Sequence, residues 1–132
     1  MQRVFWADDH VTTLQAVRVL LESRFDLVGT AMDGQQALEA VRTLRPDVVV
    51  LDVSMPELSG IEVARHLLAS EEEEQPAIVF LTIHSDAAIV EAALETGALG
   101  YVLKTSAGQD LLNAIEQVLA GRRFISPILC AN

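Results

Sequence analysis

Polar residues that could do chemistry follow four apolar runs of this 132-residue sequence. The run "VFWADD" ends in Asp8 and Asp9, "VVVLD" in Asp52, "IVFLT" in Thr82 and "GYVLK" in Lys104. A carboxylate at the end of a buried segment needs a surface opening or a chemical use, because burying an unpaired charge is costly. Three carboxylates, a hydroxyl and an ammonium group therefore form one candidate set.

The carboxylates of this set predict a bound cation. Clustered carboxylates repel one another and raise each other's pKa unless a cation intervenes. Oxygen ligands without a cluster of His or Cys favour a hard ion, and Mg²⁺ fits best, with Mn²⁺ as a possible substitute. His10 directly follows Asp9, but one histidine is weak evidence for zinc. Magnesium beside a lysine and a hydroxyl suits phosphoryl transfer, and the sequence has no Gly-rich nucleotide loop.

The elements that must position these residues alternate along the chain. Short apolar runs predict strands, and stretches with apolar residues at helical spacing predict the helices between them. The predicted strands are residues 4–7, 27–31, 48–51, 78–81 and 101–103. The apolar helical positions are Leu14, Val17 and Leu21, then Ala37, Leu38, Val41 and Leu44, then Ile61, Ala64, Leu67 and Leu68, then Val90, Ala93 and Leu94, and finally Leu111, Leu112, Ile115, Val118 and Leu119.

This alternation predicts an α/β fold with a doubly wound parallel sheet. Parallel neighbours need crossover helices, which cover both faces of the sheet. The continuous apolar runs "VVVL" and "IVFL" are typical of strands covered on both faces. All strands of such a sheet point the same way, and ligands bind beyond their carboxyl ends. The candidate residues should therefore share one pocket.

Each candidate residue also has a simpler structural role open to it. Asp9 could cap the first helix, Thr82 could cap the fourth helix or close a turn, and Lys104 could be a solvated loop residue. Asp52 is harder to account for in this way, because its loop begins only where the apolar run ends. The occurrence of complementary groups at four strand ends favours the chemical interpretation.

Composition narrows the class of protein. The hydrophobic content of 51% argues against disorder. No apolar run approaches the roughly 20 residues of a membrane helix, and the N-terminus lacks a signal-peptide pattern, so we expect a cytoplasmic protein without a membrane partner. The net charge of −10 argues against direct DNA binding by this chain. The acidic run "SEEEEQP" at residues 70–76 predicts a solvated loop.

Together these motifs resemble the receiver domain of bacterial two-component response regulators. The matching stretches are "ADD" at 7–9, "LDVSMPELSG" at 51–60, "LT" at 81–82 and "GALGYVLK" at 97–104. With "FLTIHSD" and "FISP", they most resemble the NarL/FixJ type, whose regulators usually carry a C-terminal helix-turn-helix of LuxR type. The resemblance implies a flavodoxin-like sheet of five strands in the order 2-1-3-4-5. We expect a receiver domain at 1–121 and, at 122–132, a tail or the start of a linker to an absent output domain.

The resemblance also implies roles for individual residues. Asp52 would be the phosphorylation site and would accept its phosphoryl group from a sensor histidine kinase. Asp9 and Asp52 would bind Mg²⁺, Asp9 directly, with Asp8 acting largely through water and Ser54 through its backbone carbonyl. Lys104 would pair with the phosphoryl oxygens. The chain would catalyse its own phosphorylation and dephosphorylation without being a turnover enzyme.

A conformational switch is implied as well. Thr82 would hydrogen-bond the phosphoryl group and move inward, and Tyr101, otherwise a half-buried strand aromatic, would turn into the vacated space. This would alter the face made by the fourth helix, fifth strand and fifth helix, through which a homodimer could form. Ser54 and His84 would tune the lifetime of the acyl phosphate. Thr105 stands where many receivers have a proline, often after a cis bond, which costs about 3 kcal/mol without proline.

Two other functions remain open from the sequence. A Mg²⁺-dependent aspartyl-phosphate phosphatase should carry a second aspartate where Ser54 stands, and a cap region for which 132 residues leave little room. A phosphorylation-independent receiver would act only as an interaction module, and the intact candidate set argues against it. In either receiver reading, DNA would be bound only through a C-terminal domain beyond this sequence.

Overall fold

All five strands predicted from the sequence are present in the computed structural model, which describes residues 1–69 and 74–130. They agree with the predicted bounds to within one residue at each end. Residues 70–73 of the acidic run lie outside the described residues. The strands are β1 (Arg3–Ala7), β2 (Asp26–Ala31), β3 (Val48–Leu51), β4 (Ala77–Thr82) and β5 (Gly100–Leu103), and the helices are α1 (Val11–Glu22), α2 (Gly34–Leu44), α3 (Gly60–Ala69), α4 (Ala87–Glu95) and α5 (Ala107–Leu119).

The strands form one parallel sheet that has a sixth member. Its order is β2-β1-β3-β4-β5-β6, and β6 (Phe124–Ile125) comes from the tail. The parallel α/β fold is thus confirmed, whereas the prediction of five strands has to be corrected. A two-residue strand is too short to show a period in the sequence, and its pairing with β5 defines it.

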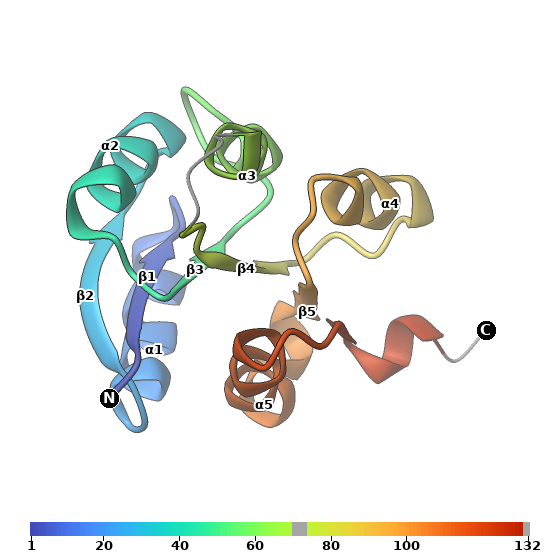
Figure 1. The fold of residues 1–132 in the computed structure, drawn as a ribbon. Coiled ribbons are helices and arrows are strands. Elements are labelled where there is room, and N and C mark those ends of the chain that lie inside the picture. Colours follow the sequence, from blue (N-terminus) through green and yellow to red (C-terminus); the bar gives the residue numbers. More distant parts are fainter. Residues whose placement is uncertain (70–73, 131–132) are drawn as a thin grey trace.

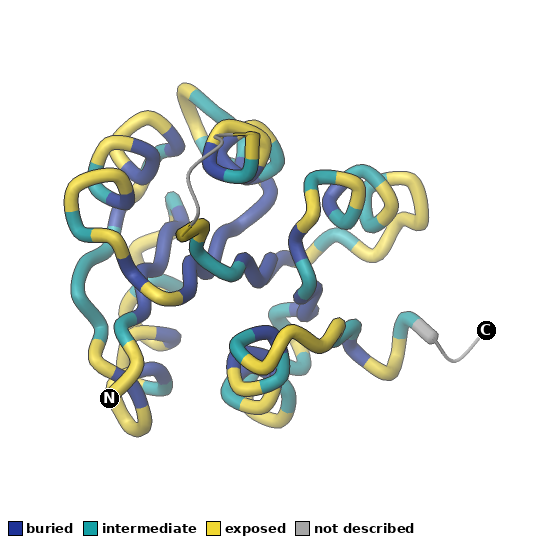
Figure 2. The backbone as a smooth tube through the Cα atoms, in the orientation of Figure 1, coloured by how far each residue is buried: buried dark blue, intermediate teal, exposed yellow. Residues whose placement is uncertain are grey.

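Helices cover both faces of the sheet (Figure 1): α1 and α5 lie on one face, and α2, α3 and α4 on the other. Successive strand residues alternate between the two cores, so that Phe5 packs towards α2 and α3 while Val4 and Trp6 pack towards α1 and α5. The strands β1, β3, β4 and β5 are buried almost throughout, whereas β2 and β6 at the two edges of the sheet are mostly of intermediate exposure, and exposed residues lie on the outer faces of the helices and in the loops (Figure 2). In the described part of the chain, no helix is long and apolar enough to cross a membrane.

The tail is fastened to β5 and α5 by a buried serine. Ser126 is fully buried, and its backbone N–H donates to the carbonyl of Tyr101 at 2.9 Å. Its Oγ accepts a hydrogen bond from the backbone N–H of Leu103 and donates one to Asp110 Oδ2, both at 3.1 Å. These bonds extend the sheet beyond β5, and a short 3-10 helix (Pro127–Cys130) follows.

Candidate functional site

The central strands bring two of the predicted carboxylates together. Asp8 directly follows β1 and Asp52 directly follows β3, and the last residues of these strands, Ala7 and Leu51, are register partners. The backbone N–H of Asp52 donates to the carbonyl of Ala7 at 3.1 Å. Both residues are buried: the exposed fraction is 0% for Asp8 and 3% for Asp52. Rigid paired backbone therefore fixes the position of each acid.

Lys104 joins these two acids. Its Nζ lies 2.7 Å from Asp8 Oδ2 and 3.0 Å from Asp52 Oδ2. The lysine follows β5, which is separated from β3 by β4, so its long side chain reaches across the end of an intervening strand. It opens a short 3-10 helix (Lys104–Ser106), and among the described residues no peptide bond is cis, including the one before Thr105. Lys104 is thus a bridging cation rather than a solvated loop residue.

Burial and the shared lysine shift the pKa values of these groups in different directions. Burial is the largest influence on Asp52 and raises its pKa, despite the hydrogen bond from Lys104. Burial also acts to raise the pKa of Asp8, but the hydrogen bonds from Lys104 and from the His10 backbone outweigh it and leave the pKa lowered. Burial acts to lower the pKa of Lys104, yet its two carboxylate partners raise it overall. Lys104 therefore stays charged, while Asp52 is the acid that ionises less readily.

An acidic cluster at this end of the sheet fits a divalent cation. Single ligand atoms of Asp8, Asp9, His10 and Asp52 all lie within 4.8 Å of one another. Two oxygens of this cluster, Asp8 Oδ2 and Asp9 Oδ1, are buried, and each lies beside a side-chain nitrogen. Lys104 Nζ lies 2.7 Å from the first of these oxygens, and His10 Nδ1 lies 3.1 Å from the second. Buried carboxylate oxygens with free lone pairs are suitable ligands for a hard ion.

Thr82 takes one of the simpler structural roles considered for it, whereas Asp9 does not. Thr82 is the fully buried last residue of β4, and its Oγ1 accepts a hydrogen bond from the backbone N–H of His84 at 3.3 Å. It therefore closes a turn, but it does not cap α4, whose N-cap is Asp86. Asp9 does not cap α1 either, because the N-cap there is His10. Asp9 is left facing the acidic cluster.

Tyr101 is fully buried, so the simpler alternative of a half-buried strand aromatic is wrong. Its hydroxyl donates to the backbone carbonyl of His84 at 2.7 Å, and its ring centroid lies 6.3 Å from that of Phe80. Burial, with smaller contributions from Asp86 and Asp52, raises the pKa of Tyr101 to about 12. The tyrosine therefore remains a neutral hydrogen-bond donor that ties β5 to the loop after β4.

Two features of the surrounding loops were not evident from the sequence. Ser54 Oγ lies 2.8 Å from His84 Nε2, so the loops after β3 and β4 are joined by a hydrogen bond. The start of α3 lies directly against the backbone of Asp52, because a Cβ on Gly60 would stand 1.9 Å from the Asp52 carbonyl oxygen. The sequence pointed to Ser54 and His84 separately, and it gave no indication of the close approach at Gly60, the first residue of α3.

Comparisons with known proteins agree with this geometry. The chain is 34% identical over 127 residues to the transcriptional regulatory protein DegU of Brevibacillus brevis, covering 95% of this chain and 53% of that protein. It is 34% identical over 128 residues to the response regulator UvrY of Escherichia coli strain K12, covering 96% and 58%. A crystal structure of a LuxR-family two-component response regulator from Aurantimonas sp. SI85-9A1 matches with a TM-score of 0.91 at 36% identity, over 98% of this chain and 93% of that one.

The family model for the response regulator receiver domain matches residues 4–116. The chain spans a little over half the length of the two curated relatives described above. The matched segment runs from β1 into α5 and includes Asp8, Asp52, Thr82 and Lys104. We conclude that this chain belongs to the receiver domain family of two-component response regulators.

Proposed function

We propose that the domain is a phosphoacceptor whose Asp52 takes a phosphoryl group from a phosphohistidine of a sensor histidine kinase. The observation that carries the proposal is a buried carboxylate at a rigid strand end, with Lys104 Nζ 3.0 Å away. A carboxylate oxygen of Asp52 would form the new O–P bond as the N–P bond of the phosphohistidine breaks. The electron pair of the broken bond would return to the imidazole of the kinase.

The neighbouring groups would support this transfer. Lys104 would pair with the oxygens of the transferred group, and its raised pKa supports a permanent positive charge. Asp8, Asp9, Asp52 and the backbone carbonyl of Ser54 would hold Mg²⁺, or Mn²⁺ in its place. The bound cation would supply positive charge to the phosphoryl oxygens. Burial raises the pKa of Asp52 and thus disfavours its ionised form. The positive charges of Lys104 and the bound cation would oppose this effect and keep the nucleophile ionised.

Phosphorylation would change the conformation of the domain through Thr82 and Tyr101. The Thr82 hydroxyl accepts a hydrogen bond from the His84 backbone, and its own hydrogen could be donated to a phosphoryl oxygen. Tyr101 is already buried and bonded to the carbonyl of His84, so a phosphoryl group that draws Thr82 inward would stabilise this arrangement. Ser54 and His84, joined at 2.8 Å, would limit the access of water to the acyl phosphate.

The output would be an altered interaction surface on α4, β5 and α5. A groove of about 940 Å³ lies between α4 and the tail, with Val90, Leu94, Ile125 and Ile128 among its lining residues. We propose that this face takes part in a phosphorylation-dependent homodimer, which light scattering with and without a phosphoryl mimic would test. An unchanged mass would count against the dimer. Control of transcription would require a DNA-binding domain outside this sequence, because the chain itself carries a net charge of −10.

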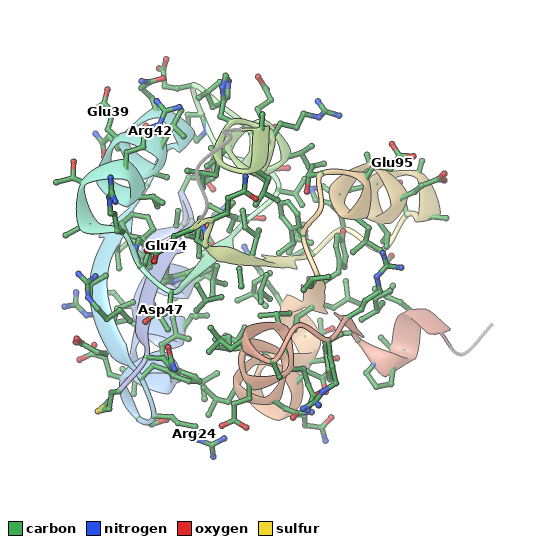
Figure 3. The ribbon with its side chains drawn as sticks, in the orientation of Figure 1. Arg24, Glu39, Arg42, Asp47, Glu74 and Glu95 are labelled. Carbon is green, nitrogen blue, oxygen red and sulfur yellow. The ribbon has the colours of Figure 1, made fainter. Side chains whose placement is uncertain are left out.

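The phosphoacceptor proposal is tested by intact-mass measurement after incubation with acetyl phosphate and Mg²⁺. We expect one labile phosphoryl adduct on the wild-type protein and none on Asp52→Asn. Asp47→Asn is a matched control, because Asp47, which is labelled in Figure 3, directly precedes β3, whereas Asp52 directly follows this strand. An adduct that persists in Asp52→Asn would refute the assignment. A wild-type protein that accepts no phosphoryl group from acetyl phosphate or from a kinase would favour the phosphorylation-independent interaction module.

A further inference from the structure

Ser126 of the tail is bonded to the residue that precedes Lys104. The backbone N–H of Leu103 donates to Ser126 Oγ at 3.1 Å, and Lys104 directly follows Leu103 in the chain. We propose that Ser126 is a positioning residue for Lys104, because it fixes the end of β5 from which the lysine reaches the phosphorylation site. The inference rests on the proposed phosphoacceptor function and concerns how this chain holds its lysine in place.

The hydroxyl of Ser126 takes over where the pairing of β5 with β6 ends. The last register pair of these strands is Tyr101 with Ile125, so the ladder stops before it reaches Leu103. Leu103 is buried, and a buried N–H without an acceptor is costly. Ser126 Oγ therefore serves Leu103 in the way that a backbone carbonyl of a longer strand would.

A second hydrogen bond sets the direction of this hydroxyl. Ser126 Oγ donates to Asp110 Oδ2 at 3.1 Å, and an ionised carboxylate can only accept. The hydroxyl hydrogen therefore points to α5, and the lone pairs of Oγ remain for the N–H of Leu103. Ser126 is fully buried, so both bonds are shielded from water. A chain of hydrogen bonds thus runs from α5 through the tail to the end of β5.

The backbone around Lys104 is held on the strand side by Leu103. Leu103 is the register partner of Thr82 in β4, and the bond to Ser126 holds it from the opposite side. On the other side of the lysine, its carbonyl accepts a hydrogen bond from the N–H of Ala107. Thr105 leaves φ free between these points, whereas a proline there would fix φ near about −65°. Without that restriction, the position of Lys104 depends more on the bonds of Leu103.

The position of Lys104 matters because its ammonium group meets two acids at once. Its Nζ lies 2.7 Å from Asp8 Oδ2 and 3.0 Å from Asp52 Oδ2, on the far side of the end of β4. A misplacement of about 1 Å can slow a reaction by about a hundredfold. The flexible lysine side chain can follow part of such a shift, so we expect a loss of about tenfold when the Ser126 hydroxyl is removed.

The first test observes the lysine itself. Lys104 is the only lysine of the sequence, so isotopically labelled lysine gives NMR signals from this one side chain, with no phosphoryl group required. We expect these signals to move in Ser126→Ala and in Asp110→Ala. Asp110→Asn keeps an acceptor oxygen and should resemble wild type. So should the control Ser23→Ala, because the hydroxyl of Ser23 is bonded to the carbonyl of Leu20 instead.

The second test measures the rate of adduct formation with acetyl phosphate and Mg²⁺. We expect Ser126→Ala to slow it about tenfold and Ser23→Ala to leave it unchanged. If Ser126 acts through the lysine, Ser126→Ala should slow the reaction of Lys104→Ala by less than about twofold. A general loss of structure would slow both backgrounds alike. Thermal melting followed by circular dichroism would show whether each variant is folded.

The outcomes separate this role of Ser126 from the phosphoacceptor proposal. Unchanged lysine signals in Ser126→Ala, or equal slowing with and without Lys104, would overturn the positioning role and leave the phosphoacceptor proposal in place. A wild-type protein that accepts no phosphoryl group would overturn the latter, and the lysine signals would still decide whether Ser126 holds Lys104 in position. Should Ser126→Ala fail to fold, identical lysine signals in Asp110→Ala and Asp110→Asn would overturn the proposal.

Discussion

At the scale of single residues, Asp8 and Asp52 share one lysine but respond differently to burial. The pKa of Asp52 is raised from its ordinary value of 3.8, because burial outweighs the bond to Lys104. The pKa of Asp8 is lowered from the same value, because Lys104 and the His10 backbone outweigh burial. In the folded protein without a cation, the charge of Asp52 is therefore unfavourable and that of Asp8 favourable.

These directions predict opposite effects of two similar substitutions on stability. A raised folded pKa favours folding only while the acid is protonated, and this contribution is lost as the pH rises through the folded pKa. A lowered folded pKa favours folding above the ordinary value of 3.8, and this contribution is lost as the pH falls through the folded pKa. At pH 7 we expect Asp52→Asn to raise the free energy of unfolding and Asp8→Asn to lower it, each by about 1 kcal/mol.

Urea unfolding in the presence of a chelator would measure both differences. The advantage of Asp52→Asn should shrink as the pH falls, and so should the deficit of Asp8→Asn, since both acids become protonated in wild type. Changes of the same sign for the two variants at pH 7 would contradict the assignment of the pKa directions.

The hydrogen bond between Ser54 and His84 predicts coupled effects on dephosphorylation. Because these side chains contact each other at 2.8 Å, replacing either by Ala removes the same interaction. We expect Ser54→Ala and His84→Ala to change the decay rate of the acyl phosphate more than the stability of the fold, and the double variant to deviate from additivity.

Phosphate-release assays would measure the decay of the phosphorylated variants. Ser106→Ala is a suitable control, because this residue at the N-cap of α5 makes no side-chain capping bond. Decay rates equal to that of wild type in all variants would show that the pair does not control the lifetime.

At the scale of elements, apolar patterning predicted the strands because buried parallel strands have continuous apolar sequences. It also predicted that Asp8, Asp52 and Lys104 meet, since the carboxyl ends of parallel strands lie at one edge. The strand β6 could not be predicted, because its two residues have no period and its position depends on the hydrogen bonds of Ser126. Tyr101 also has a neighbour in the tail, since its register partner in β6 is Ile125.

The details of the site that escaped prediction depend on loop conformation. The sequence placed Ser54 and His84 near the phosphoryl group but contained no information on their mutual distance. His10 was considered only as weak evidence for zinc, and its contact with Asp9 at 3.1 Å could not be predicted from its place in the sequence. Spacing along the chain predicts which strand ends converge, whereas side-chain contacts between loops require the folded backbone.

The contact between α3 and the loop of Asp52 predicts a large effect of a small substitution. A Cβ at position 60 would stand 1.9 Å from the carbonyl oxygen of Asp52. The oxygen belongs to the backbone and the Cβ is bonded directly to it, so neither atom can rotate away. The N–H of Gly60 also donates to the carbonyl of Val53 at 2.8 Å, which limits relief by movement of the helix. We expect Gly60→Ala to destabilise the fold by about 2 kcal/mol or more and to slow adduct formation at Asp52.

Gly108 provides the matched control, because a Cβ there would meet no atom within 4 Å. It lies in α5, where Ala is a better helix former than Gly, so Gly108→Ala should raise stability by up to about 1 kcal/mol. Urea unfolding and the acetyl phosphate assay would measure both variants. Equal behaviour of the two would show that the close approach at Gly60 does not constrain the site.

The buried serine of the tail predicts a second effect on stability. Ser126→Ala would remove the acceptor of the Leu103 N–H and the hydrogen bond that Ser126 donates to Asp110. We expect a loss of about 1–3 kcal/mol and faster hydrogen exchange at the amide of Leu103. The exposed Ser23, whose Oγ donates to the carbonyl of Leu20, is the control, and Ser23→Ala should cost much less. An unchanged exchange rate at Leu103 would contradict this account of the tail.

At the scale of the whole molecule, one strand connects the site to the tail. Lys104, which bridges the two buried acids, directly follows β5. Tyr101 and Leu103 of the same strand hold the tail through hydrogen bonds with Ser126. The position of the tail, which forms the edge of the sheet next to β5, therefore depends on the conformation of β5.

The shortness of β6 has a consequence for self-association. Exposed strand edges recruit other chains, and proteins often protect them with short edge strands. β6 has two residues and covers β5, whose four residues are all buried. A chain ending at Gly121 should keep its helical circular dichroism but form concentration-dependent aggregates in light scattering, and a monodisperse shortened chain would contradict this. The last residues of the tail would then protect the edge of β5 from edge-to-edge polymerisation, independently of any signal that the domain receives.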